Sequence, residues 1–186
     1  MLDFYKGKKV FITGHTGFKG SWMCRVLKTV GADVTGFSQP PPTSPALFDI
    51  AGIGEGMRCV TGDVRDFEAL AACFESVSPD IVIHLAAQPI VRESYEKPRY
   101  TFETNVMGTV NVLECVRRTP SVRSVLNVTT DKVYKNNEWE WGYRESDELC
   151  GADPYSNSKS CSELVTQSYN NSFFADGRVA VSTARA

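Results

Sequence analysis

The sequence has little of what usually marks a metal, membrane or nucleic-acid protein. Its 186 residues include only two histidines, and its six cysteines form no Cys-x-x-Cys pair. We therefore expect no metal site and no secreted disulfide framework, but reduced thiols in a cytoplasmic protein. No apolar run approaches the length of a membrane span, and 20 basic residues against 22 acidic ones leave no basic stripe for nucleic acid. The length suffices for one α/β domain with a sizeable core.

A group of glycines stands where the first apolar segment ends. Residues 10–12 predict a strand and residues 18–30 a helix. The glycines, at three-residue spacing, are Gly14, Gly17 and Gly20. Such a turn is an anion site, because backbone N–H groups and the helix dipole face the ligand and glycine lets a pyrophosphate approach. By itself the motif fits a plain tight turn equally well. His15, inside the turn, either covers the pyrophosphate or only occupies a permissive position.

Strand and helix patterns alternate along the chain. Strands are predicted at residues 9–13, 32–37, 58–61, 81–87, 122–128 and 178–183, and helices at 18–30, 67–76, 98–118 and 154–174. This alternation predicts an α/β fold with a doubly wound, mostly parallel, Rossmann-like sheet and helices on both faces. Ligands of such sheets bind beyond the carboxyl ends of the strands. The glycine turn, Asp63, residues 86–87 and Thr130 all fall there, which favours a nucleotide site.

The end of the second strand bears on which dinucleotide would bind. An acidic residue there favours NAD, and a basic residue favours NADP. The sequence has Ser38 and Gln39 at this point, so it lacks the usual acid and has no arginine for a 2′-phosphate. We expect NAD.

Tyr155 and Lys159 lie four residues apart just inside the helix that Asp153 and Pro154 are predicted to begin. This spacing places both side chains on one helix face. A phenol has a pKa of about 10, so it is a poor base unless an ammonium and a positive nicotinamide ring lower that pKa. The pair is a candidate proton acceptor for alcohol oxidation, with Thr130 steadying the same hydroxyl. Alone, the pair fits a solvated helix face better.

Together with the glycine motif, these residues resemble the extended short-chain dehydrogenase/reductase family. The resemblance covers essentially the whole chain and rests on motifs at residues 13–20, 62–64, 84–87, 105–109 and 155–159. It implies that Thr130, Tyr155 and Lys159 form the catalytic Ser/Thr–Tyr–Lys set. The residues it implies for the NAD site are Gly14, Thr16, Gly17, Phe18, Lys19, Gly20, Asp63, Val64, Leu85, Ala86, Ala87, Gln88, Asn105, Tyr155 and Lys159. For Gln88 and Arg92, a solvated loop remains the alternative.

Asp131 and Lys132 narrow the resemblance to the nucleotide-sugar 4,6-dehydratases. The sequences at residues 14–22 and 131–136 are similar to the branch that acts on CDP-glucose. This implies a lyase that converts CDP-glucose to CDP-4-keto-6-deoxyglucose through transient oxidation at C4 by NAD. Tyr155 would take the 4-hydroxyl proton, Lys132 would take the C5 proton, and Asp131 would protonate the departing 6-hydroxyl. A surface ion pair is the structural alternative for Asp131 and Lys132.

Other functions stay open at this point. They are a 4,6-dehydratase for GDP-mannose or dTDP-glucose, an epimerase, and an inactive cofactor-binding module. Family members continue into a smaller substrate domain, which this sequence lacks, so we expect residues 1–186 to form the NAD-binding domain. The resemblance also implies a homodimer through the helices at 98–118 and 154–174, whose apolar faces would equally fit packing on the sheet. Trp139 and Trp141 either cover the site or pack on a neighbouring loop.

Overall fold

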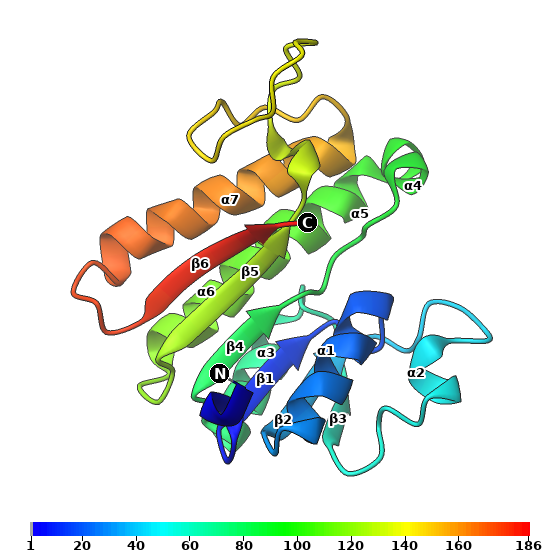
Figure 1. Cartoon of the computed structure of the whole chain (residues 1–186), viewed down its shortest axis with the longest axis vertical. Helices are drawn as coiled ribbons and strands as arrows, with labels where there is room; N and C mark the ends of the chain where they lie inside the picture. The colour runs from blue at the N-terminus through cyan, green and yellow to red at the C-terminus, as the bar shows by residue number, and fades with distance from the viewer. Residues whose placement is uncertain (1) are drawn as a thin grey trace.

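Strand β1 (Lys9–Thr13) lies inside a six-stranded parallel sheet in the computed structural model, which describes residues 2–186 (Figure 1). The strand order is β3-β2-β1-β4-β5-β6. The other strands are β2 (Asp33–Ser38), β3 (Arg58–Thr61), β4 (Ile81–His84), β5 (Ser124–Thr129) and β6 (Ala180–Arg185). The order reverses between β1 and β4, and ligands of doubly wound sheets bind at such a reversal. The predicted fold class is confirmed.

Helices lie against both faces of the sheet, but one face is left open along β5 and β6, whose residues on that side are only partly buried (Figure 1). The principal ones are α1 (Phe18–Thr29), α3 (Phe67–Val77), α6 (Gly108–Arg118) and α7 (Pro154–Phe173). Successive side chains of a strand point to opposite faces, so β1 contributes to two cores. Val10 and Ile12 pack in one core with Cys24 of α1. Phe11 packs in the other, with its ring 4.4 Å from that of Phe74 of α3. Burial on both faces explains the unbroken apolar runs of the central strands.

The helix predicted at residues 98–118 is present but not uniform. It begins as α5 (Pro98–Phe102), passes through a π-helical turn, η2 (Glu103–Met107), and continues as α6. A π turn admits an extra residue and often marks a functional position. Asn105 lies inside this turn.

Several short elements were not expected from the sequence. They are α2 (Leu47–Ile50), α4 (Val91–Glu96) and the 3₁₀ turns η1 (Leu2–Tyr5) and η3 (Asp131–Val133). Each is too short for an apolar period to become visible. Residues 136–149 form an irregular segment that stands out from the sheet beyond β5 and α7 (yellow in Figure 1).

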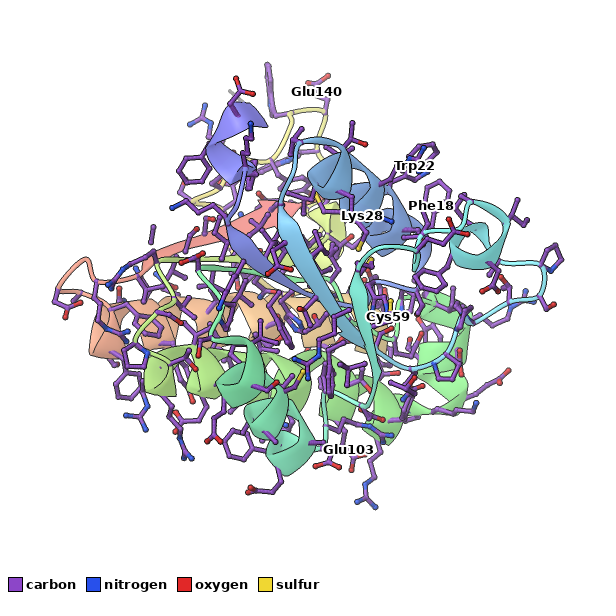
Figure 2. The ribbon with its side chains drawn as sticks, turned by 90° about the horizontal axis from the view of Figure 1, so that it is seen from below. Phe18, Trp22, Lys28, Cys59, Glu103 and Glu140 are labelled. Atoms are coloured by element: carbon purple, nitrogen blue, oxygen red, sulfur yellow. The ribbon has the colours of Figure 1, made fainter. Side chains whose placement is uncertain are left out.

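Some boundaries differ from the prediction. β4 ends at His84 rather than at residue 87, because the N–H groups of Leu85 and Ala86 both bond to Thr13, the last residue of β1, and the pairing of the two strands goes no further. β6 lies two residues further along the chain than expected. Phe18 and Trp22 stand on the outer side of α1 (Figure 2), 72% and 54% exposed. The spacing of the apolar residues thus predicted this helix correctly. Its buried face, however, includes smaller residues such as Cys24 and Ser21.

Candidate active site

The glycine turn between β1 and α1 uses its three glycines for different reasons. Gly14 has a φ of +75°, and a Cβ there would lie 2.7 Å from the Ala86 nitrogen. A Cβ on Gly20 would overlap the carbonyl oxygen of Gly14. The packing of the protein itself therefore requires both glycines. At Gly17, φ is −76° and a Cβ would come no closer than 3.4 Å to another atom. A ligand that approaches this backbone accounts for glycine here, so the turn fits a pyrophosphate.

His15 does not face that ligand position. Its ring is buried, occupies the space where Gly36 of β2 has no Cβ, and meets the Phe48 ring edge-on at 5.3 Å. Burial lowers the pKa of His15 to about 4, so the imidazole is neutral at physiological pH. Of the two alternatives for His15, the structure favours a packing role behind the turn.

The expected adenosine end of the site is built from β2 and the loop after β3. Thr16 Oγ1 donates a hydrogen bond to the Gln39 carbonyl oxygen at 2.9 Å, and Gln39 Nε2 donates to Asp63 Oδ2 at 2.6 Å. Burial tends to raise the pKa of Asp63, but hydrogen bonds from Arg65 and Gln39 hold it below its usual value. Arg65 was not considered from the sequence. Its guanidinium lies 2.6 Å from the Asp63 carboxylate. The positive charge of Arg65 is therefore already neutralised within the protein.

Val64 and Gln88 are turned toward the protein rather than toward open space. Val64 is buried and touches α6 at Gly108. The Gln88 amide is used internally, since Nε2 donates to Thr101 Oγ1 at 2.9 Å and Oε1 accepts from the Ile90 nitrogen at 2.6 Å. Both residues therefore shape the site through the backbone and loops that they hold.

Asn105 joins the loop after β4 to α7. Its Oδ1 accepts from the Gln88 nitrogen at 2.8 Å, and its Nδ2 donates to the Gln88 oxygen at 3.1 Å and to Ser158 Oγ at 2.9 Å. The loop that it holds contains Leu85, Ala86 and Ala87, directly opposite Gly14. The π turn places this buried amide between the two segments, so the loop and α7 are fixed relative to each other.

Tyr155 and Lys159 project from the first turns of α7. Asp153 caps this helix by accepting a hydrogen bond from the Ser156 nitrogen at 3.0 Å, as predicted. Lys159 is buried, and its Nζ donates to the Val128 carbonyl oxygen at 3.2 Å. Burial, and secondarily the Lys19 ammonium, lowers the pKa of Lys159 to about 8. The two residues therefore lie at the carboxyl end of β5.

The pKa of the Tyr155 phenol is subject to opposing influences within the protein. Burial raises the pKa of Tyr155, while a hydrogen bond with Thr130 and the charge of Lys132 act in the opposite direction. The protein's own groups therefore do not produce the lowered pKa that a general base needs. A further positive charge beside the phenol would be required to do so.

Asp131 and Lys132 stand on the 3₁₀ turn η3 that follows Thr130. Thr130 Oγ1 donates to Asp131 Oδ1 at 3.1 Å and accepts from the Lys132 nitrogen at 3.4 Å. The Lys132 ammonium lies 3.7 Å from Asp131, and the two side chains are 57% and 74% exposed. An exposed pair of this kind contributes little to stability. The turn brings an acid and a base beside Tyr155.

Glu163, Arg185 and Tyr134 form a connected group that the sequence analysis missed. Glu163 lies one turn beyond Lys159 on α7, and its carboxylate is 3.0 Å from Arg185 Nη2. In the sequence, only the four-residue spacing between Lys159 and Glu163 could have pointed to this group. Within residues 2–186, no three His, Cys, Asp or Glu side chains gather closely enough to suggest a metal site, and no helix is long and apolar enough to cross a membrane.

Comparisons with known proteins agree with this geometry. A family model described as GDP-mannose 4,6 dehydratase matches residues 11–181. CDP-glucose 4,6-dehydratase of Salmonella typhimurium LT2 is 52% identical over 176 residues, which cover 94% of this chain and 49% of that protein. CDP-paratose 2-epimerase of Salmonella typhi is 31% identical, with 89% and 54% covered. The chain spans about half the length of these curated relatives.

Solved structures give the same fold. UDP-glucose 4-epimerase of Thermus thermophilus, determined in complex with NAD, superposes with a TM-score of 0.83 at 26% identity. The match covers 95% of this chain and 54% of that one. Since the family model matches almost the whole chain, the chain belongs to the GDP-mannose 4,6-dehydratase family within the extended short-chain dehydrogenases/reductases.

Proposed function

We propose that the protein to which this chain belongs binds NAD and removes water from a nucleotide hexose, with CDP-glucose as its substrate. The observation that carries the proposal is the turn Thr130–Lys132, which sets a carboxylate and an ammonium 3.7 Å apart next to Tyr155. Alcohol oxidation alone needs only a Tyr–Lys pair. The additional acid and base are what water elimination requires. The 52% identity to a CDP-glucose 4,6-dehydratase supports the choice of substrate.

NAD would be held by the glycine turn, by the segments around Asp63 and residues 85–88, and by Asn105, Tyr155 and Lys159. When bound, it would supply the hydride acceptor for C4 of the sugar and the hydride donor for C6. The room left at Gly17 supports this assignment. The salt bridge that already occupies Arg65 supports NAD over NADP, because a free arginine would be needed for a 2′-phosphate.

Tyr155 would act first. Its phenolate oxygen takes the proton of the sugar 4-hydroxyl while the Thr130 hydroxyl holds that oxygen in place. Burial works against the phenolate, so the ionised form depends on positive charge nearby. Lys132 supplies part of it, and Lys159, one helical turn further along α7, would add to it.

Lys132 and Asp131 would then carry out the elimination. A ketone at C4 makes the C5 proton acidic, and Lys132 Nζ takes that proton in its neutral form. The carboxylic acid of Asp131 gives its proton to the 6-hydroxyl, which leaves as water. Both side chains are exposed in this chain, so a bound sugar must cover them to favour their neutral forms. Return of the hydride to C6 would need a proton at C5, which the protonated Lys132 gives back, and the 4-hydroxyl proton left on Tyr155 would restore the acid form of Asp131 through solvent.

The test is mass spectrometry of nucleotide sugars incubated with the whole protein and NAD. The panel contains CDP-glucose, dTDP-glucose, UDP-glucose and GDP-mannose. We expect CDP-glucose alone to lose one water. Lys132→Met should abolish the loss while C4 oxidation, seen as absorbance of the reduced cofactor, persists. Lys135→Met is the matched control, since Lys135 lies in the same segment but pairs with Glu148 at 3.0 Å. Water loss at the parent rate by Lys132→Met would refute the assignment.

A cofactor-binding module without turnover is the second candidate for the isolated 186 residues. The observation in its favour is that the chain spans about half of its curated relatives. In this case NAD would raise the melting temperature, and no nucleotide sugar would change mass.

We also propose a cytoplasmic homodimer that forms through the long helix at residues 98–118 and through α7. Met107 is the last residue of η2, directly before α6, and Leu164 and Phe173 lie on α7. All three side chains are about half exposed. A helix surface that faces only solvent would favour polar residues at these positions. Sedimentation should show a dimer, and Leu164→Glu should give a monomer with an unchanged far-ultraviolet spectrum. A parent that sediments as a monomer would contradict this.

A further inference from the structure

Glu163 is the one acidic residue within α7, and its carboxylate is heavily hydrogen-bonded. It is buried, and it accepts hydrogen bonds from Thr129 of β5, from Thr183 of β6 at 3.0 Å and from Arg185 at 3.0 Å. Burial tends to raise the pKa of Glu163, but Arg185 and Thr129 lower it below its usual value. The carboxylate is therefore ionised and anchors the end of β6 to the helix that carries Tyr155 and Lys159.

Arg185 uses the other side of its guanidinium on a different segment. Nη1 donates to Tyr134 Oη at 2.7 Å and to the Glu145 carbonyl oxygen at 3.1 Å, while Nη2 holds Glu163. The guanidinium also lies 4.9 Å from the centre of the Tyr134 ring. A planar fork can make these contacts at the same time, whereas a lysine ammonium cannot. Arg185 thus joins α7 to the segment after η3.

Tyr134 follows the Asp131–Val133 turn directly. Its ring stacks on Tyr143 at 5.2 Å with an interplanar angle of 11°, and Trp139 packs against Tyr143 in turn. The backbone of Tyr134 pairs with that of Leu149. A cavity of about 300 Å³ is lined by Asp131, Tyr134, Glu145, Thr183 and Arg185. The guanidinium and the candidate acid therefore border the same space.

We propose that Arg185 is a positioning residue that holds the Asp131–Lys132 turn against α7 through Tyr134, and that it thereby serves water elimination rather than C4 oxidation. The chemical part rests on the proposed function. The structural part does not, since it concerns only which contacts keep the turn and residues 136–149 in place.

Digestion with endoproteinase Lys-C tests the structural part without any substrate. Lys132 and Lys135 flank the supported tyrosine, and Lys97 is a distant exposed reference. In Arg185→Met, cleavage after Lys132 and Lys135 should be about tenfold faster or more, with cleavage after Lys97 unchanged. Thr183→Val is the matched control, because it removes a hydrogen bond from the same carboxylate but leaves Tyr134 untouched, and it should behave like the parent.

Tyr134→Phe is a second variant for the case that Arg185→Met destabilises the whole chain. It deletes only the hydroxyl that Arg185 contacts, and it should also speed cleavage at Lys132 and Lys135 selectively. Parent-like cleavage of Tyr134→Phe, or equal acceleration by Thr183→Val, would overturn the positioning role.

The chemical part is read in the whole protein with CDP-glucose and NAD. Tyr134→Phe should form the reduced cofactor at nearly the parent rate and then lose water about tenfold more slowly, so the reduced cofactor accumulates. Equal slowing of both steps would overturn the link to elimination. A parent that dehydrates none of the four nucleotide sugars would refute the proposed function instead, and the Lys-C result would still decide whether Arg185 positions the turn.

Discussion

Lys159 Nζ donates a hydrogen bond to the Val128 carbonyl oxygen at 3.2 Å, which fixes a buried ammonium of α7 to the strand that leads into Thr130. The same strand end supplies the turn that carries Asp131 and Lys132. This contact is one of several that hold the Tyr–Lys helix against the candidate acid and base, and the hydrogen bond from Ser160 Oγ to the Val133 carbonyl oxygen at 2.7 Å is another.

The buried lysine should make stability depend on pH in the alkaline range. Its pKa is about 8 in the folded protein against 10.5 ordinarily, so between these values the unfolded chain binds more protons. Stability from this group therefore rises with pH across that window, and Lys159→Met lacks the rise. From about pH 7.5 to 9.5 the parent should gain roughly 2 kcal/mol over the variant in urea unfolding. Parallel curves for the two proteins would contradict this.

Gly17→Ala should separate ligand binding from folding. A Cβ there has 3.4 Å of clearance within the protein, so the variant should unfold like the parent. It should nevertheless bind NAD about tenfold more weakly or worse, because the methyl group faces the pyrophosphate. Calorimetric titration measures this. Gly20→Ala is the contrasting variant and should fail to fold stably, since its Cβ meets the Gly14 carbonyl. Unchanged affinity of Gly17→Ala would place the pyrophosphate elsewhere.

Asn105→Ala should lower the free energy of unfolding and loosen the loop after β4. The substitution leaves the buried Gln88 N–H group without its partner at 2.8 Å. An unpaired buried donor costs about 1–3 kcal/mol, which urea unfolding can measure. Asn111→Ala in the same long helix is the control. Its amide bonds to the Val64 oxygen at 2.9 Å from a more accessible position, and a smaller loss is expected. Equal losses would mean that the π turn gives Asn105 no special role.

Glu163→Ala should be strongly destabilising. It leaves the Arg185 guanidinium, whose side chain is 16% exposed, without its acid, and removing one partner of a buried pair costs about 3–5 kcal/mol. Glu148→Ala, which breaks the exposed pair with Lys135, should change little.

The contribution of Glu163 should also depend on pH in the acid range. Its pKa is lowered in the folded protein, so its contribution is present above its ordinary pKa and is lost as pH falls through the folded value. Glu163→Gln should therefore approach the parent only in acid. A difference that stays constant down to low pH would show that the charge is not what stabilises the pair.

Local patterns were enough to predict much of this molecule. The strand from residue 9 to 13 and the glycine turn are visible because periodicity and glycine spacing are properties of adjacent residues. The helix start at Asp153 was also predicted correctly, since a cap bonds only to residues two or three positions away. The family resemblance rests on the same short motifs, and the comparisons confirm it.

The sequence by itself therefore determined the order of the strands along the chain, the glycine turn and the helix that carries Tyr155 and Lys159. Only the tertiary structure decided where His15 points, that Asn105 holds Ser158 from 53 positions away, and that Arg185 joins Glu163 to Tyr134. The physical reason is that these are contacts between side chains far apart in the chain. They exist only once the parallel sheet has brought the carboxyl ends of its strands to one edge, and no local pattern encodes them.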